Sequence, residues 1–264
     1  MNQTRKNFRQ YGDTSSRLVV LHGGPGGAGE IEPLARELEP LARELGHRGH
    51  AVLEPFQTRQ SVSGQVDELR SQIEEHCMPP VDMIGWSWGA WLGCLLAAQY
   101  GKLVRKLIIV GSGPLEAQYS SAIRTTKNSR LTNKERTELK AIRLTGEDAV
   151  ARFIELSDIA DTYARDASPQ PTVRFDGAIH AAVWPEADGM RKSGALLNAV
   201  SAIRCPILAI HGDYDPRPSA GVQTPLQAAL PTAQFVQLEK CGHKPWQEIH
   251  AKDDFYRLVE NGLA

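Results

Sequence analysis

Short apolar runs recur along the chain at intervals long enough to hold a helix. Several of them are apolar almost throughout, as in parallel strands that are buried on both faces. Amphipathic stretches between the runs, such as Ile31–Gly46 and Val66–Cys77, predict helices. This alternation predicts a mostly parallel central sheet flanked by helices. The predicted strands are Arg17–Gly23, His50–Pro55, Val81–Trp86, Lys106–Gly113, Cys205–Asp213 and Ala233–Gly242.

The alternation breaks between Pro114 and about Val200, where polar and helix-like segments follow one another without a convincing buried strand. So long an excursion between two strands predicts a small helical cap. We expect residues 1–113 and 201–264 to form the core and residues 114–200 to form the cap insertion. The basic stretch Arg124–Lys140 lies in this insertion and is typical of a solvated helix face.

The composition narrows the classes of partner. The 264 residues are 41% hydrophobic and 23% charged, which suits one large domain, and the net charge of −1 gives no reason to expect nucleic acid or an anionic membrane. No segment approaches the roughly 18 to 20 apolar residues that cross a bilayer, and the first residues hold no apolar signal stretch. The four scattered cysteines suit a reducing compartment. We therefore expect a cytoplasmic protein without a nucleic acid or membrane partner.

A serine stands between two glycines directly after the strand Val81–Trp86, in the sequence Gly-Trp-Ser-Trp-Gly. A helix-like run follows, so the motif has the strand-turn-helix setting of a G-x-S-x-G nucleophile elbow. Gly85 and Gly89 have to be small because strand and helix nearly touch there. The strained turn holds the hydroxyl of Ser87 above the sheet at a helix N-terminus, whose dipole favours an oxyanion. Ser87 is the predicted nucleophile, with a purely structural turn as the alternative.

A serine nucleophile needs a base, and the base needs a carboxylate that orients it, in the chain order Ser, acid, His. The strand Cys205–Asp213 ends in a polar loop with two candidate acids. Asp215 stands three residues after Gly212, the usual place of the acid in H-G-x-x-D loops, whereas Asp213 is better placed to cap or brace the loop. His243, in the strand-end loop before the last helix, is the predicted base, and capping that helix is its alternative role.

Other side chains are assigned lesser roles. His180 lies in the excursion, where it could line a pocket, although a surface position is the favoured expectation. His211 is expected to pack within the end of its strand. Trp86 and Trp88 flank the nucleophile, so we expect one of them to shape the substrate pocket. Trp184, in the insertion, is expected to close that pocket from above.

The glycine-rich stretch Val19–Glu30 follows the first predicted strand. It lacks the G-K-[ST] ending of a phosphate loop, and no G-x-G-x-x-G spacing is set against a downstream acid. Such glycines let backbone N–H groups approach a reacting carbonyl. We expect the amides of Gly24 and Trp88 to form an oxyanion hole, in which one donor contributes about 3 to 4 kcal/mol of transition-state stabilisation. These parts imply no metal and no organic cofactor.

With these motifs, the chain resembles the α/β-hydrolase superfamily over essentially its whole length. The resemblance implies an α/β-hydrolase fold with an inserted helical cap. The elements HGGPGG and GSGP are most similar to the proline iminopeptidase branch, and GWSWGAWL and HGDYDP resemble a group of bacterial hydrolases. The motifs are HGGPGG at His22–Gly27, GWSWGA at Gly85–Ala90, VRKLIIVGSGP at Val104–Pro114, HGDYD at His211–Asp215 and CGHKPW at Cys241–Trp246.

The stretch Glu54–Gly64 departs from the proline iminopeptidases, which carry D-Q-R-G-x-G-x-S at this place. We therefore expect a serine hydrolase that cleaves a small carboxylic ester or related acyl compound through an acyl-enzyme. An aminopeptidase or amidase with the same triad is the first alternative and would need an acidic, amine-binding cluster in the cap. A non-catalytic ligand-binding relative is the second alternative, because a fold does not fix a function.

Overall fold

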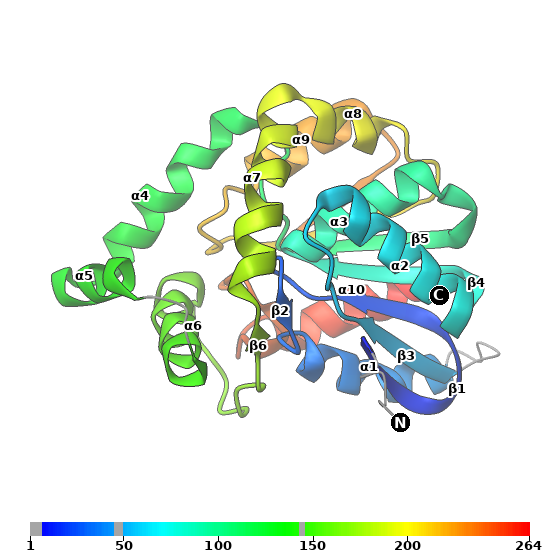
Figure 1. Ribbon diagram of the computed structural model, residues 1–264, viewed down its shortest axis with the longest axis horizontal. Helices are drawn as coiled ribbons and strands as arrows, with labels where there is room; N and C mark the ends of the chain where they lie inside the picture. The colour runs from blue at the N-terminus through cyan, green and yellow to red at the C-terminus, as the bar shows by residue number, and fades with distance from the viewer. Residues whose placement is uncertain (1–6, 45–49, 143–145) are drawn as a thin grey trace.

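The computed structural model describes residues 7–44, 50–142 and 146–264 (Figure 1). The end of the predicted helix Ile31–Gly46 lies outside the described residues. Within them, the main sheet has the strand order β3, β1, β4, β5, β7, β8, in which β1 and β3 are antiparallel and the other neighbours are parallel. The predicted, mostly parallel sheet is confirmed. Its strands are β1 (Phe8–Leu21), β3 (His50–Pro55), β4 (Cys77–Trp86), β5 (Val104–Val110), β7 (Ile207–Gly212) and β8 (Gln234–Leu238).

The first strand is longer than predicted. It begins at Phe8, and its first half pairs antiparallel with β3, where Tyr11 lies opposite Val52. Its second half pairs parallel with β4. The first half has a neighbour on one side only and carries polar residues such as Arg9 and Gln10, so it lacks the apolar run by which the other strands were predicted.

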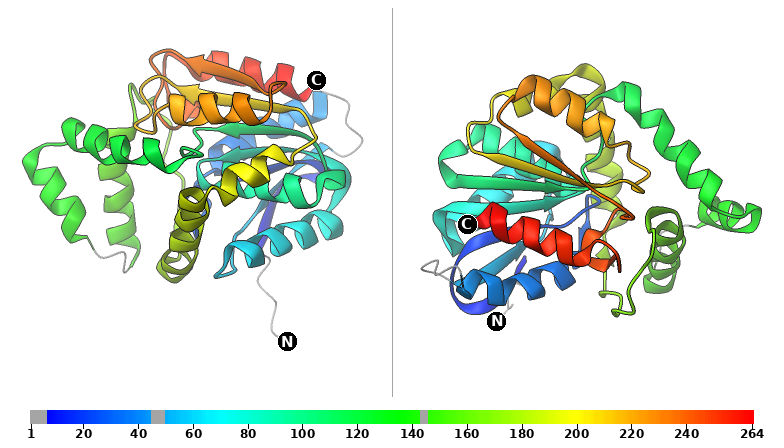
Figure 2. Two further views of the ribbon diagram at one scale, coloured as in Figure 1. Left: turned by 90° about the horizontal axis from the view of Figure 1, so that it is seen from above. Right: turned by 180° about the vertical axis from the view of Figure 1, so that it is seen from behind.

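Side chains on alternate positions of the central strands point to opposite faces of the sheet. Val19 and Leu21 pack on one face, whereas Leu18 and Val20 pack on the other. Helices cover both faces, as Figure 2 shows. The first face is covered by α2 (Val62–His76), α3 (Trp88–Gln99), α8 (Ala195–Ser201) and α9 (Ala220–Ala229), and the second by α1 (Glu32–Glu44) and α10 (Lys252–Leu263).

The chain leaves the sheet after β5 and returns to it at β7. In Figures 1 and 2 the helices α4, α5 and α6 lie to one side of the sheet, and α7 lies between them and α3. The strand β6 pairs with β2 and joins this segment to the glycine-rich loop. The division into core and cap at residues 114 and 200 stays a prediction. The elements are α4 (Ser120–Arg130), α5 (Asn133–Ala141), α6 (Glu147–Asp161), β6 (Arg174–Phe175), α7 (Gly177–Ser193) and β2 (Gly27–Ala28).

The carboxyl ends of β4, β5, β7 and β8 meet at one edge of the sheet because these strands are parallel. The loops that follow β4, β7 and β8 carry Ser87, Asp215 and His243. Among the described helices, none is long and apolar enough to cross a membrane.

Candidate active site

Ser87 sits at the turn between β4 and α3 with a backbone φ of 55° and ψ of −115°. A positive φ is strained for a serine and is typical of residues held at functional sites. The close approach of strand and helix explains the flanking glycines. A Cβ at Gly85 would overlap the carbonyl of Gly89, and a Cβ at Gly89 would overlap the carbonyl of Leu21. The sharp turn therefore depends on both glycines.

His243 and Asp215 form a close, buried pair. The Nδ1–H group of His243 donates a hydrogen bond to Asp215 Oδ2 at 2.6 Å, and the two side chains are 4% and 0% exposed. Trp86 packs beside the imidazole, with ring centroids 5.0 Å apart, and its indole N–H donates to the carbonyl of His243 at 2.8 Å. Since Nδ1 is bound to the carboxylate, Nε2 is the imidazole nitrogen left to exchange a proton.

The two candidate acids have different partners. Asp213 accepts a hydrogen bond from the backbone N–H of Cys241 at 3.0 Å, so it braces the loop between β8 and the histidine. Asp215 is the carboxylate that reaches His243. The structure also confirms that His211 packs within its strand end, where its Nε2–H donates to the carbonyl of Arg217 at 2.7 Å.

Burial and neighbouring charges set the protonation of the pair. Burial, and after it the Arg217 guanidinium, lowers the pKa of His243 to about 4, against the opposing effect of Asp215. Burial alone would raise the pKa of Asp215, but His243 and then Arg217 lower it below its usual range. At neutral pH the imidazole is therefore uncharged and the carboxylate is ionised, which are the states that a general base and its orienting group require.

His22 is fully buried and supports the glycine-rich loop. Its Nδ1 lies 2.9 Å from the carbonyl of Gly23, and the Gln57 amide donates to the carbonyl of His22 at 3.0 Å. Burial lowers the pKa of His22 to about 4, so the ring is neutral and acts as a brace. Gly24 has a φ of 30° in this loop. Trp88 begins α3, where backbone N–H groups have no intrahelical partner.

One cavity of about 380 Å³ collects most of the predicted site residues. Another hollow, of about 530 Å³, lies along β8 and α10 and contains none of them. Asp215 lies behind His243 rather than on the wall of the first cavity. The predicted residues that line that cavity are Gly24, Trp86, Ser87, Trp88, Trp184 and His243.

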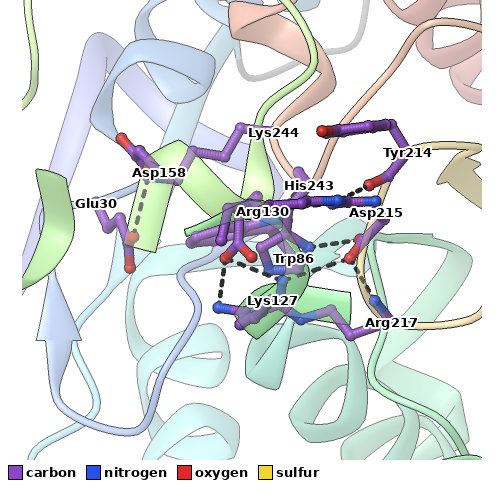
Figure 3. Close-up of polar contacts among 12 residues, drawn as sticks. Glu30, Trp86, Lys127, Arg130, Asp158, Tyr214, Asp215, Arg217, His243 and Lys244 are labelled. Carbon is purple, nitrogen blue, oxygen red and sulfur yellow. Dashed lines mark hydrogen bonds and ion pairs between the residues drawn. The ribbon is translucent and has the colours of Figure 1, made fainter. Parts of the chain in front are cut away.

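An ionic cluster in the same cavity was not predicted (Figure 3). Asp161, at the end of α6, binds Lys127 at 2.9 Å and Arg217 at 3.0 Å through the same carboxylate oxygen. The backbone N–H of Arg217 donates to Asp215 Oδ1 at 2.9 Å, and its guanidinium lies 3.4 Å from that oxygen. The inserted segment is thereby tied to the carboxylate that orients His243. The residues are too far apart in the sequence to form a recognisable motif.

Another cation, Lys244, follows the histidine directly and is buried. Lys244 binds Asp158 at 2.9 Å and Glu30 at 3.3 Å, so it joins the histidine loop to α6 and to the end of the glycine-rich stretch. Burial raises the pKa of Glu30, while Lys244 opposes that effect. Figure 3 shows this group on the other side of His243 from Arg217.

Glu248 is a third connection between the insertion and the histidine loop. Its carboxylate is completely buried and accepts backbone hydrogen bonds from Tyr163 at 2.9 Å, Ala164 at 2.7 Å and Gly242 at 2.7 Å. One side chain thus fixes the residues after α6 against the residue before His243.

Two expectations about the insertion were wrong. His180 is half-buried and lines the cavity instead of lying at the surface, because α7 turns this face toward the glycine-rich loop. The basic stretch Arg124–Lys140 is not simply a solvated face. Lys127 points into the cavity, and Arg130 donates to the carbonyls of Ala160 and Tyr214 at 2.7 Å each.

Within the described ranges, no His, Cys, Asp and Glu side chains form a group of three that could hold a metal ion.

Comparison with known proteins agrees with this architecture. A family model described as alpha/beta hydrolase fold matches residues 66–246. The chain is 25% identical to 2-hydroxymuconate semialdehyde hydrolase of Pseudomonas putida, over 98% of this chain and 91% of that protein. It is also 25% identical to the pimeloyl-[acyl-carrier protein] methyl ester esterase of Nitrosomonas europaea, over 87% of this chain and 89% of that protein.

Solved structures show the same fold at low identity. The crystal structure of VinJ superposes with a TM-score of 0.67 at 16% identity, over 97% of this chain and 95% of that chain. At this identity the likeness extends to the fold alone.

Proposed function

Because the chain belongs to the α/β-hydrolase family, we propose that it is a serine hydrolase that cleaves a small carboxylic ester or a related acyl compound. Ser87 is the nucleophile, His243 is the general base and Asp215 orients the base. The observation that carries the proposal is the buried 2.6 Å hydrogen bond from His243 Nδ1 to Asp215, because His243 lines the same cavity as Ser87.

The reaction follows from these positions. Nε2 of His243 takes the proton of the Ser87 hydroxyl as its oxygen attacks the acyl carbon, and then returns it to the leaving alcohol. Water attacks the resulting acyl-enzyme with His243 again as base, which releases the carboxylic acid and restores Ser87. Proton transfer by a positioned base accelerates such a reaction by about 100 to 10,000-fold. The amides of Gly24 and Trp88 stabilise the oxyanion in both halves of the reaction.

The charges in the cavity favour an ester over a peptide with a free amine. An aminopeptidase needs carboxylates that are open to an ammonium group. Asp158 and Glu30 both bind Lys244, and Asp161 binds Lys127 and Arg217. A substrate amine would have to displace a cation of the protein itself. The esterase name of one relative also favours the ester, although at 25% identity it only supports the class.

We further propose that residues 114–200 form the cap over this cavity.

The test compares p-nitrophenyl esters of short acids with proline and alanine p-nitroanilides. We expect the native chain to cleave the esters. In Ser87→Ala the rate of ester cleavage should fall at least about a thousandfold, because without the nucleophile only binding and the oxyanion hole contribute to catalysis. A fluorophosphonate probe should label the native chain and leave Ser87→Ala unlabelled.

Each other result has a definite meaning. Cleavage of the anilides alone would replace the esterase by the aminopeptidase. Labelling of Ser87 without turnover of the panel would keep the serine hydrolase and restrict its substrate range. If neither turnover nor labelling occurs with a folded chain, the catalytic proposal is wrong.

A further inference from the structure

Aromatic rings make up an unusual share of the cavity that contains Ser87. Phe, Trp and Tyr are 6% of the chain, whereas five of the 21 residues that line the cavity are Phe or Trp. Those five are Trp86, Trp88, Phe153, Phe175 and Trp184, and the imidazoles of His180 and His243 add two more rings. The lining of this cavity is therefore richer in aromatic rings than the chain as a whole.

Four of these rings belong to one continuous ladder, together with Trp91 behind them. Trp88 meets Trp91 edge to face, with centroids 6.2 Å apart. Trp91 stacks with Trp184 at 6.0 Å and 14°, and Trp184 stacks with His180 at 6.2 Å and 16°. Phe175 follows His180 at 5.6 Å. The ladder thus runs from the residue after the nucleophile to β6, beside the glycine-rich loop.

Hydrogen bonds fix the orientation of Trp88 and Trp91 in this ladder. The indole N–H of Trp88 donates to Gln65 Oε1 at 3.0 Å, and that of Trp91 donates to the carbonyl of Gly113 at 3.1 Å. His180 and Trp184 are four residues apart on α7 and therefore share one helix face. Burial lowers the pKa of His180, so its ring is neutral near pH 7 and adds no charge to the wall.

Trp184 remains 38% exposed although it stacks on two rings. Trp184 also lines the cavity, to which α6 contributes Val150, Phe153 and Ile154. Aromatic rings attract one another in stacked and edge-to-face arrangements beyond the effect of buried area. We therefore expect a flat ring to bind better here than a saturated ring of equal size.

We propose that the substrate carries a planar aromatic or conjugated group, which binds along the ring ladder formed by Trp88, Trp184, His180 and Phe175 while its acyl carbon reaches Ser87. This inference rests on the proposed function and specifies its substrate class. The planar group belongs to the acyl part or to the alcohol part of the ester, and the experiment distinguishes the two.

The experiment uses pairs of esters that differ only in the ring. The p-nitrophenyl esters of 3-phenylpropanoic and 3-cyclohexylpropanoic acid have one leaving group and a remote ring, so their intrinsic reactivities match. The acetates of 2-phenylethanol and 2-cyclohexylethanol place the same two rings on the alcohol side. We expect kcat/KM to favour the phenyl member of at least one pair by about threefold to tenfold.

Two variants test whether the ring ladder causes that preference for the phenyl ester. Trp184→Leu and His180→Leu remove rings and keep apolar side chains, and we expect the ratio of phenyl to cyclohexyl kcat/KM to fall to about one in each. Ile159→Ala is the matched control, because Ile159 is an exposed residue of α6, 42% exposed, that does not line the cavity. Its ratio should equal that of the native chain. A ratio is insensitive to any general loss of active protein.

A ratio of one or less for both ester pairs in the native chain would overturn the inference, and so would a preference that survives in both ring variants. Calorimetry with Ser87→Ala separates this inference from the hydrolase proposal. It compares 3-phenylpropanoate with 3-cyclohexylpropanoate, and 2-phenylethanol with 2-cyclohexylethanol. Tighter binding of the phenyl member of at least one pair supports the ladder even if no ester is cleaved. Equal binding within both pairs overturns it whether or not esters are cleaved.

Discussion

Asp213 and Asp215 follow the same strand but have different environments. One accepts a hydrogen bond from a backbone amide, and the other accepts the imidazole N–H of His243. Both were candidate acids from the sequence, and the spacing of the H-G-x-x-D loop favoured Asp215. The direction of each side chain, which the loop geometry sets, gives the two carboxylates their different partners.

We expect Asp215→Asn to lower kcat by about 10⁴-fold, because an amide can hold the wrong imidazole tautomer and cannot stabilise the imidazolium. Asp213→Asn keeps an acceptor oxygen for the Cys241 amide and should retain kcat within about tenfold. Ester turnover under saturating substrate measures both. Equal losses in the two variants would contradict the assignment of Asp215.

Arg217 is expected to control the acid limb of the pH profile. Burial, and after it the charge of Arg217, lowers the pKa of His243 to about 4, and the proposed base acts as the neutral imidazole. The native kcat/KM should therefore fall only as the pH approaches about 4. Arg217→Gln removes the repulsion, so the inflection should move up toward the ordinary histidine value of about 6.5. The profile of kcat/KM reports this group in the free enzyme.

Arg217→Lys is the control for that profile, because it keeps a cation beside Asp161 and Asp215. Its inflection should stay close to the native one even if its rate is lower. An inflection that stays fixed in Arg217→Gln would mean that Arg217 does not tune the base.

The turn between β4 and α3 leaves no room for a side chain at Gly85 or Gly89. We expect Gly89→Ala to lower the free energy of unfolding by at least about 2 kcal/mol, because its Cβ overlaps the backbone of β1. Gly189→Ala is the matched control on α7. Nothing lies within 4 Å of a Cβ there, so alanine should stabilise the chain by about 0.5 to 1 kcal/mol. Thermal denaturation measures both, and equal effects would contradict the close approach.

The sheet could be predicted because its central strands are apolar on both faces, and each predicted run overlaps an observed strand. The first half of β1 could not, since it pairs on one side only. The elbow and the two loops that follow β7 and β8 could be predicted because each is a short local motif. The cluster of Lys127, Asp161 and Arg217 could not, because its members come from three distant segments and meet only after folding.

At the scale of the whole molecule, Glu248 joins the inserted segment to the histidine loop. Glu248→Gln replaces one of its two acceptor oxygens by an amide donor that would face a backbone N–H. We expect the free energy of unfolding to fall by about 2 to 4 kcal/mol, since these bonds are buried and charge-assisted. The exposed Glu239→Gln should stay within about 0.5 kcal/mol of the native chain. Chemical denaturation of both variants tests this, and a stable Glu248→Gln would contradict the role of the carboxylate.

The segment between β5 and β7 has a consequence for how this chain can diverge. Its two ends are held by strands that pair directly, Leu107 beside Ile207. The entropic cost of closing a flexible loop grows only with the logarithm of its length, by about 0.6 kcal/mol for each doubling. Insertions and deletions between the two strands are therefore tolerated by the sheet. Over generations, a lineage can therefore vary the helices that we propose to select the substrate, as long as it keeps the residues of α6 that bind Arg217 and Lys244.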